Sequence, residues 1–262
     1  MIYAFRNHLI DYLKIAQLCT ELVHLNLGLP VAVVTNDRAF PTGADYTVMF
    51  EPEEGTKRHF HEYGESAPWY NRGRERSWDI TPFRHTIVMD ADYLVMSDTL
   101  LKYVDLDLAV SRELYELTKP AESTYTAFGP TGYPSYWASL MVFDKENPVS
   151  YEFFQLMKKV KRSWPYFSNL FGLDTSLYRN DHIVAIALYL LHGRRWSKVN
   201  DLPLVILNSD HTRNLVSIDK HDLSLSFTGY GIEPPDVLTF YGRDIHVANK
   251  RSFLQVIEET TK

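Results

Sequence analysis

Two aspartates one residue apart, Asp90 and Asp92, directly follow the apolar residues Ile87-Val88-Met89. Carboxylates that leave a strand at this spacing can both turn toward one point. Hard divalent cations such as Mn²⁺ and Mg²⁺ prefer oxygen ligands, and they bridge diphosphates well. The pattern therefore indicates a cation site that neutralises a nucleotide diphosphate, and a solvated loop is the alternative because loops are rich in aspartate.

The elements around these aspartates predict an α/β fold. Residues 2–5 (IYAF) and 31–35 (VAVVT) have the apolar, β-branched composition of buried parallel strands. Between them, apolar residues recur at helical spacing over residues 8–25, and Gly28 and Pro30 end that helix. Such alternation predicts a single domain with a mixed, mainly parallel sheet flanked by helices. Ligands of these sheets bind beyond the carboxyl ends of the strands, where Asp90 and Asp92 lie.

The rest of the chain continues this alternation. Ser66 is predicted to cap a helix that has Pro68 near its first position, and residues 120–137 predict an irregular loop because they are rich in Pro, Gly, Ser and Tyr. Further strands are expected at 46–50, 86–89, 107–110, 138–144, 204–207, 223–227, 238–240 and 245–247, and further helices at 98–103, 148–163, 174–193 and from 250 onward.

Composition limits the class of protein. The chain has 262 residues, 45% hydrophobic and 23% charged, which suits one domain with a full core. The single cysteine, Cys19, excludes an intrachain disulfide and a cysteine-based zinc site, and it favours a reducing compartment. The first residues lack the pattern of a signal peptide, and the longest apolar run, residues 183–191, is shorter than the roughly 20 residues that cross a bilayer. A soluble, cytoplasmic protein with no membrane partner is therefore expected.

Charge is unevenly distributed along the chain. The net charge is −6, yet residues 151–200 hold eight basic and three acidic residues, with rings among them in KKVKRSWPYF and GRRWSK. This mixture suits a nucleic-acid backbone and an unstacked base, and two solvated helix faces are the alternative. The candidate acceptor-binding residues are Tyr136, Trp137, Lys158, Arg162, Arg194 and Arg195.

The stretch SWDITPFRHTIVMDADYLVMSDTL resembles the family 8 glycosyltransferases, such as glycogenin and the bacterial lipopolysaccharide galactosyltransferases. The opening strand, helix and strand resemble the first unit of that family. The resemblance implies a GT-A fold over residues 1–262, with a nucleotide-binding half (1–98) and an acceptor half that ends in a metal and diphosphate segment (99–262). It also implies a nucleotide-diphosphate sugar donor, in particular a UDP-sugar, and a Mn²⁺ or Mg²⁺ ion. The matched residues are Trp78, Thr81, Phe83, Met89-Asp90-Ala91-Asp92 and Leu94-Val95.

The same resemblance implies roles for individual residues. Asp181 corresponds to an aspartate near the anomeric carbon and is the candidate catalytic residue, with helix capping as the alternative. His246 corresponds to the third metal ligand beside Asp90 and Asp92. Lys250 corresponds to a lysine on the diphosphate, a role that Arg251 could take instead because the spacing here is shorter. The segment Ala138–Leu140 retains only Ser139 of a sugar-contacting motif. The candidate donor-binding residues are Tyr3, Ala4, Arg74, Asp90, Ser139 and Lys250.

The function predicted from these residues is metal-dependent transfer of a sugar to a hydroxyl acceptor, with retention at the anomeric carbon. The chain also looks like small glycosyltransferase-like proteins of tailed bacteriophages, so the acceptor is expected to be either a glycan or a hydroxymethylated base in phage DNA. A nucleotidyltransferase is one alternative, but IYAFRNHL has no glycine-rich phosphate loop. A non-catalytic or degenerate nucleotide-sugar-binding protein is the other. The donor sugar and the oligomeric state do not follow from the sequence.

Overall fold

A mixed sheet of ten strands forms the centre of the part of the chain that the structure describes, with strand order β3-β2-β1-β6-β12-β8-β13-β17-β7 and β9 paired with β8. The structure is a computed structural model and describes residues 1–40, 42–53, 57–117, 119–123, 127–128, 132–174, 178–229 and 236–260. The strands of this sheet are β1 (Ile2–Tyr3), β2 (Ala32–Thr35), β3 (Tyr46–Met49), β6 (His85–Asp90), β7 (Tyr93–Leu94), β8 (Leu108–Glu116), β9 (Lys119–Ser123), β12 (Trp137–Asp144), β13 (Asp201–Ser209) and β17 (Ile245–Val247).

Two parallel blocks make up most of this sheet. β3, β2, β1 and β6 run parallel to one another, and so do β8, β13 and β17. β12 lies between the blocks and is antiparallel to both of its neighbours, β6 and β8. The expected α/β fold with a mixed, mainly parallel sheet is therefore confirmed.

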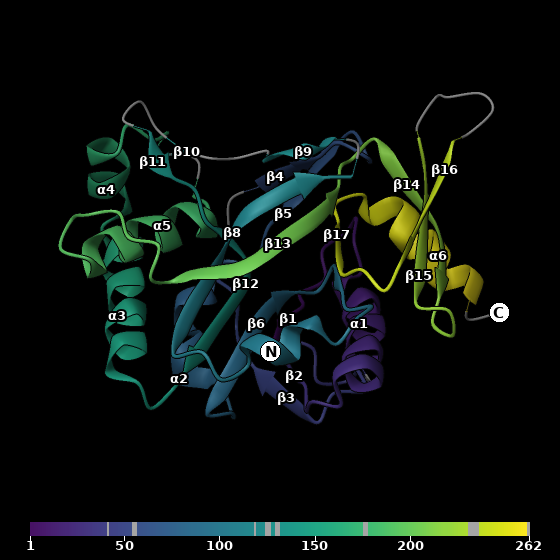
Figure 1. The fold of residues 1–262 in the computed structure, drawn as a ribbon, viewed down its shortest axis with the longest axis horizontal. Coiled ribbons are helices and arrows are strands. Elements are labelled where there is room, and N and C mark those ends of the chain that lie inside the picture. Colours follow the sequence, from purple (N-terminus) through teal and green to yellow (C-terminus); the bar gives the residue numbers. More distant parts are fainter. Residues whose placement is uncertain are drawn as a thin grey trace.

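Helices cover both faces of the sheet (Figure 1), with α1 and α6 on one side and α3, α4 and α5 on the other. Side chains alternate between these faces along each strand, as the pleat requires. Ile2 and Met89 join the core on the α1 side, whereas Tyr3 and Val88 join the core on the α3 side. The helices are α1 (Tyr12–Leu27), α2 (Ser77–Ile80), α3 (Pro148–Arg162), α4 (Trp164–Leu170), α5 (Asn180–Leu191) and α6 (Lys250–Thr260), with 3₁₀ turns η1 (Arg74–Arg76) and η2 (Thr99–Tyr103).

The first helix ends at Gly28 as its sequence predicts, but it begins at Tyr12 rather than near residue 8. The Asp11 carboxylate accepts hydrogen bonds from the backbone N–H groups of Leu13 and Lys14 at the start of α1. Gly28 ends α1 with φ of 63°, a left-handed conformation that costs glycine little. Strands β1 and β2 are therefore joined by a helix whose two ends have caps supplied by neighbouring residues.

Smaller sheets lie outside the central one. β4 (Lys57–Phe60) and β5 (Glu65–Pro68) form a hairpin, β10 (Ala127–Phe128) pairs with β11 (Tyr133–Pro134), and β14 (Arg213–Asp219), β15 (Ser224–Gly229) and β16 (Val237–Tyr241) form a three-stranded sheet that packs against α6.

One predicted helix is wrong. Ser66 and Pro68 lie in strand β5 rather than at a helix start, because residues 65–68 pair with β4. Helical structure begins only at Arg74. The expected irregular loop over 120–137 is also wrong in part, since β9, β10 and β11 reach into it and β12 begins at Trp137, while residues 124–126 and 129–131 lie outside the described residues.

No helix among the described residues combines the length and the apolar character that a membrane-spanning segment needs.

Glu62, in the turn of the β4–β5 hairpin, connects this hairpin to the start of α6. Its Oε1 accepts from the backbone N–H of Lys250 at 3.2 Å, and its Oε2 lies 3.4 Å from Nδ1 of His211. Burial alone raises the pKa of Glu62, but His211 and two backbone N–H groups outweigh this and lower the pKa to about 2. The ionised carboxylate therefore stabilises the folded position of α6.

We expect Glu62→Gln to remove a pH-dependent part of the stability. Since the folded pKa lies below the unfolded value, the contribution is present above about pH 4.5 and is lost as the pH falls toward 2. The free energies of unfolding of wild type and variant should differ by roughly 1.5–3 kcal/mol near neutrality and converge near pH 2. Urea unfolding at a series of pH values measures this, with Glu65→Gln, an exposed position on the same hairpin, as control. A difference that stays constant with pH would contradict the assignment.

Candidate functional site

The carboxyl end of β6 and strand β17 bring three potential metal ligands together. Asp90 is the last residue of β6, Asp92 follows two residues later, and β17 pairs with β7 so that His246 stands opposite Tyr93. One ligand atom from each of Asp90, Asp92 and His246 lies within 4.8 Å of the others. The pairing of β17 with β7 thus brings a histidine from late in the chain to the two aspartates.

Asp90 presents one oxygen to this cluster and bonds to the protein with the other. Its Oδ1 accepts hydrogen bonds from Arg74 and from Nδ2 of Asn71, at 3.3 Å. Its Oδ2 faces Nε2 of His246 at 3.9 Å. Arg74 is completely buried, with its guanidinium 4.5 Å above the ring of Tyr3. The buried guanidinium of Arg74 therefore fixes the orientation of the Asp90 carboxylate.

Asp92 also presents one oxygen to the cluster and bonds to the protein with the other. Its Oδ2 forms an ion pair with Lys250, and its Oδ1 lies 3.3 Å from Nε2 of His246. Burial alone raises the pKa of Asp92, but the neighbouring Lys250 and His246 outweigh this and hold the pKa well below its ordinary value. Asp92 is therefore a carboxylate at neutral pH although it is only 6% exposed.

His246 contacts a supporting side chain with one ring nitrogen and presents the other nitrogen to the cluster. Its Nδ1 lies 2.7 Å from Oδ1 of Asn208, and its Nε2 faces the two carboxylates. Ligands about 2.1 Å from a cation stand about 3 Å apart when they are adjacent in an octahedron. The distance from Nε2 to Asp92, 3.3 Å, is close to this value, and the distance to Asp90, 3.9 Å, is longer. A donor set of two carboxylate oxygens and one imidazole nitrogen suits Mn²⁺ or Mg²⁺. The residues present fit a divalent cation.

The charges of the cluster are balanced before any cation is added. Asp90 is paired with Arg74, and Asp92 is paired with Lys250. A divalent cation bound between the two carboxylates would therefore leave a positive site. A positive site at the carboxyl ends of sheet strands suits an anionic ligand such as a diphosphate.

Lys250 is largely enclosed by protein. Its ammonium donates to the carbonyl oxygens of Val247 and Ala248 in addition to its ion pair with Asp92, so all three of its protons have acceptors. A direct bond to a donor molecule requires it to release one of them. Arg251 is exposed and lines a separate groove together with His61 and Asn214.

Asp181 lies in the first turn of α5, beside the start of β12. Its Oδ1 accepts from the backbone N–H of Ala138 at 2.9 Å, and its Oδ2 pairs with Arg179 at 2.9 Å. Ser139 follows Ala138 in β12 and is almost fully buried. Since Leu140 is opposite Met89 in the antiparallel pair of β12 and β6, the backbone of Ser139 lies near that of Asp90.

Asn71 and Asn180 connect α5 to the cluster. Nδ2 of Asn180 donates to the backbone oxygen of Asn71 at 2.7 Å, and Nδ2 of Asn71 donates to Asp90. The start of α5, which carries Asp181, is therefore joined to a candidate metal ligand by two hydrogen bonds in series.

The remaining candidate donor residues lie beneath the cluster. Tyr3 is opposite Asp90 in the sheet, and its hydroxyl contacts the backbone oxygen of Gly73 and the hydroxyl of Ser77. Ala4 is fully buried, and its N–H donates to Val34. Tyr3 supports the end of β6 and Ala4 bonds to β2, and a direct contact of either residue with a donor stays a prediction.

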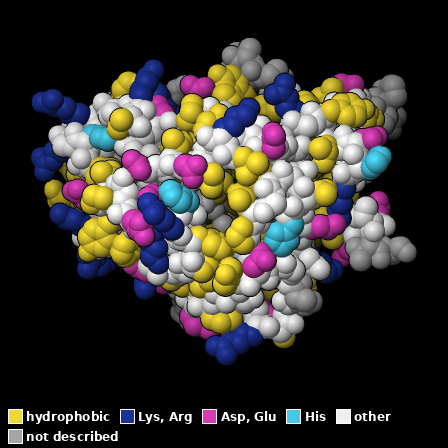
Figure 2. Space-filling model, turned by 60° about the horizontal axis from the view of Figure 1, so that its bottom comes forward, with side chains coloured by type: hydrophobic (Ala, Val, Ile, Leu, Met, Phe, Trp, Pro, Cys, Tyr) yellow, Lys and Arg dark blue, Asp and Glu magenta, His cyan; other side chains and the backbone are white. Residues whose placement is uncertain are grey.

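Two lysines of α3 in the basic window 151–200 are paired with carboxylates from outside that window. Lys158 pairs with Asp79 at 2.8 Å, and Lys161 pairs with Glu75 at 2.7 Å and with Glu53 at 2.9 Å. Figure 2 shows dark-blue basic side chains gathered on the side of α3 to α5, with magenta acidic side chains among them. The acidic partners come from outside the window, which is why the local sequence suggested an uncompensated patch.

The candidate acceptor residues are spread over different surroundings. Tyr136 is buried, and its hydroxyl donates to Asp201 at 2.7 Å. Arg162 is exposed at the end of α3, and Arg194 is exposed beyond α5 with φ of 63°. Trp137, at the start of β12, is partly buried. No single surface feature of the described residues contains all of these side chains.

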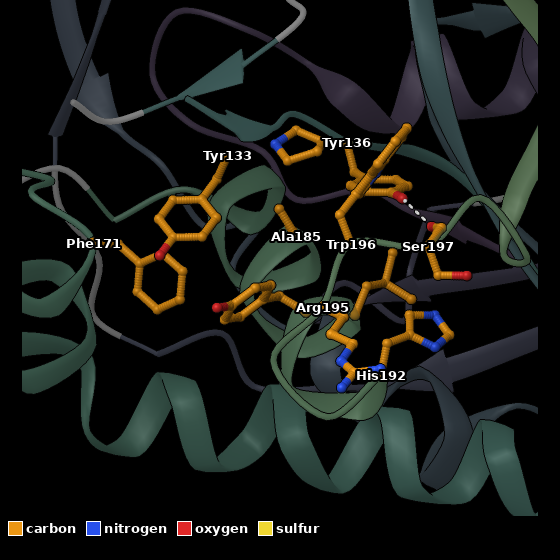
Figure 3. Close-up of a pocket in the computed structure, with 11 residues that line it drawn as sticks. Tyr133, Tyr136, Phe171, Ala185, His192, Arg195, Trp196 and Ser197 are labelled. Atoms are coloured by element: carbon orange, nitrogen blue, oxygen red, sulfur yellow. Dashed lines mark hydrogen bonds between the residues drawn. The ribbon is translucent and has the colours of Figure 1, made fainter. Parts of the chain in front are cut away.

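A cavity beside α5 contains two of them, Tyr136 and Arg195 (Figure 3). In this cavity the rings of Tyr133 and Phe171 are 4.6 Å apart, and those of Tyr133 and Tyr189 are 5.1 Å apart. These rings contact one another, so they contribute first to packing between α4, α5 and the start of β11.

Three residues of the site were not identified from the sequence, namely Asn71, Asn208 and Glu116. Asn71 lies in a segment without a recognisable pattern. Asn208 is the only one with a usable signal, because it is a polar residue at the carboxyl end of the apolar strand VIL. Strand pairing brings Glu116 to Asn208 and Asn208 to His246, whereas Asn71 reaches Asp90 from the loop before η1.

Comparison with known proteins gives the following findings. No protein-family model and no curated protein matches the sequence. Three similar solved structures are galactosyltransferase LgtC in complex with donor and acceptor sugar analogs (13% identity, 72% of this chain and 69% of that chain, TM-score 0.44), glycosyltransferase GlyE of Streptococcus pneumoniae TIGR4 (12%, 72% and 42%, TM-score 0.39) and mouse xyloside xylosyltransferase 1 (12%, 74% and 81%, TM-score 0.42). These values assign neither a family nor a function to this chain, and the names give no support to a phage origin.

We expect Arg74→Met to destabilise the protein strongly, because it leaves the Asp90 carboxylate next to a buried apolar side chain. Removing one partner of a buried ion pair typically costs about 3–5 kcal/mol. Arg76→Met on the same 3₁₀ turn removes an exposed pair with Asp79 and should cost less than about 1 kcal/mol. Chemical denaturation of both variants measures the difference, and equal losses would show that Arg74 does not support Asp90.

Proposed function

We propose that this chain is a metal-dependent glycosyltransferase that moves a sugar from a nucleotide-diphosphate donor, in particular a UDP-sugar, to a hydroxyl acceptor. The observation that carries this proposal is the shared orientation of Asp90, Asp92 and His246. Each offers one ligand atom to a common point, and each is fixed through its second atom by another side chain. A solvated loop aspartate has no need of such support.

Residues of the chain have distinct roles in the proposed mechanism. The cation, when bound, neutralises charge on the diphosphate as the sugar departs. Asp90, Asp92 and His246 would hold the cation at the carboxyl end of β6 and at β17. Lys250 adds a fixed positive charge behind Asp92, which lowers the energy of the departing anion. The low exposure of Asp92 and Lys250 supports a site with little water, which limits hydrolysis of the donor.

Asp181 is proposed to act on the sugar or the acceptor from the side of α5. Its bonds with Ala138 and Arg179 fix the orientation of its carboxylate. The hydrogen-bonded connection through Asn180 and Asn71 supports a place close to the cation cluster. Transfer with retention rests on the resemblance to family 8, and the anomeric configuration of an isolated product, read by NMR, tests it.

A glycan is the proposed class of acceptor, and DNA is the less favoured class. Recognition of DNA draws on basic side chains that are free to bind phosphates. Lys158, Lys161 and Arg179 are each already paired with carboxylates. The net charge of −6 adds a further repulsion at long range.

We expect the purified protein to hydrolyse a UDP-sugar slowly when Mn²⁺ or Mg²⁺ is present, and to stop when the metal is chelated. Asp92→Ala should reduce this hydrolysis by about 100-fold or more, because it removes a ligand and leaves Lys250 without its partner. Asp79→Ala removes an acidic side chain that pairs with Arg76 and Lys158, away from the cluster, so it should leave the rate nearly unchanged. Release of UDP, screened over several UDP-sugars, measures the rates. Cation binding without hydrolysis or transfer for any donor would favour the degenerate sugar-binding protein.

We expect no specific retention of duplex DNA, with or without hydroxymethylcytosine, even at low salt. A protein that contacts several phosphates binds DNA with an affinity that falls steeply as salt rises. Fluorescence anisotropy of a labelled duplex over a salt series measures this. Tight, salt-dependent binding that Arg162→Glu or Arg195→Glu weakens would contradict a glycan acceptor and favour DNA.

A further inference from the structure

Three polar side chains form a row across the carboxyl ends of β8, β13 and β17. Asn208 is opposite Glu116 of β8 on one side and opposite His246 of β17 on the other. Asn208 is 8% exposed, and the carboxylate of Glu116 is half-buried. The three residues are far apart in the sequence, and parallel pairing alone brings them to one level of the sheet.

The hydrogen bonds along this row have only one consistent direction when Glu116 is ionised. Nδ2 of Asn208 lies 2.8 and 2.9 Å from the two oxygens of Glu116, and a carboxylate can only accept. The amide N–H₂ of Asn208 must therefore face Glu116, which leaves its Oδ1 facing His246. Oδ1 can only accept, so Nδ1 of His246 must carry the proton across the 2.7 Å contact.

We propose that Glu116 and Asn208 are positioning residues that fix the tautomer of His246, with the proton on Nδ1 and the lone pair of Nε2 directed at the cation. This inference rests on the proposed metal site. The direction of these hydrogen bonds also affects how strongly the imidazole of His246 donates electrons. The charge of Glu116 polarises the amide, and the amide makes the imidazole a stronger electron donor.

The alternative orientation explains why Glu116 matters as well as Asn208. Without an obligate acceptor at position 116, the amide can turn so that its N–H₂ donates to Nδ1. The proton of the neutral imidazole then sits on Nε2, which can no longer bind a cation. Burial raises the pKa of Glu116, and the hydrogen bonds from Asn208 oppose this rise, which is consistent with bonds that favour the ionised form.

The first measurement reads the tautomer directly in metal-free protein. Long-range ¹H–¹⁵N NMR at alkaline pH, where imidazoles are neutral, distinguishes the protonated nitrogen of each of the ten histidines. The signals of His246 are those lost in His246→Gln. In wild type, Asn208 at 2.7 Å from Nδ1 and Asp92 at 3.3 Å from Nε2 compete for the imidazole proton. We expect the shorter contact to keep the proton on Nδ1, and we expect a shift toward Nε2 in Asn208→Leu and in Glu116→Leu.

The second measurement is the affinity for Mn²⁺ alone, by calorimetry or by EPR of free Mn²⁺. Loss of such supporting partners typically weakens metal binding by about 10–100-fold, and we expect this for both leucine variants. The double variant Asn208→Asp with Glu116→Gln keeps the direction of the row, because the new carboxylate would accept both from Nδ1 of His246 and from the new amide at position 116. It should recover most of the affinity and the Nδ1 tautomer.

A matched control is Asn200→Leu. Asn200 is 7% exposed, lies just before β13, and its Nδ2 donates to the backbone oxygen of Leu108 at 2.7 Å. This variant should lose stability without a change in the tautomer of His246 or in the affinity for Mn²⁺. If removing any buried asparagine changed the tautomer of His246 or the affinity for Mn²⁺, Asn200→Leu and Asn208→Leu would change them alike.

The outcomes separate this inference from the proposed function. A proton on Nε2 in wild type, or wild-type Mn²⁺ affinity in folded Asn208→Leu, would overturn the positioning role. A proton on Nδ1 that moves in the leucine variants supports that role even if no UDP-sugar is hydrolysed, a result that would count against the glycosyltransferase alone.

Discussion

The site depends on the stability of two carboxylates in a place where water is scarce. Asp90 and Asp92 lie close together, and two like charges at this separation repel one another. Arg74 beneath Asp90 and Lys250 beside Asp92 offset this repulsion. Both cations are almost fully buried, so they too are stable only next to a carboxylate. The four charged groups therefore require one another, and none can be understood singly.

The fold supplies these groups from segments far apart in the chain. Arg74 comes from the turn before β6, the aspartates from the end of β6, and Lys250 from the first residue of α6. The two parallel blocks of the sheet meet at β12, and β17 returns to pair with β7 after Asp92. This last pairing closes the site, since it brings His246 and the start of α6 against the aspartates. A sheet that ended at β13 would leave the carboxylates without a histidine and without Lys250.

Local sequence patterns predicted the fold and the clustered residues better than they predicted the tertiary contacts around them. The strands at 2–5, 31–35 and 86–89 have continuous apolar runs, and Asp90 and Asp92 directly follow one of them. These two residues were therefore identifiable as members of the cluster, and a family resemblance added His246. The helix expected at Ser66 was wrong because its capping signal was local, whereas pairing with β4 is a tertiary interaction. The acidic partners of Lys158 and Lys161 could not be read from the local charge count either, since Asp79, Glu75 and Glu53 lie outside residues 151–200.

Lys250 connects the chemistry of the site to the packing of the chain. Its side chain pairs with Asp92, while its backbone N–H donates to Glu62 in the β4–β5 hairpin. Asn249 also caps the start of α6, because its side-chain oxygen accepts from the backbone N–H of Ser252. The position of Lys250 is therefore set by the hairpin and by the helix cap, without help from a ligand. At the proposed site, Asp92 would be shared between a bound cation and Lys250, and the ammonium would then need a second anion. Under the proposed function a donor diphosphate would supply that anion, so metal binding and donor binding would favour one another through Lys250.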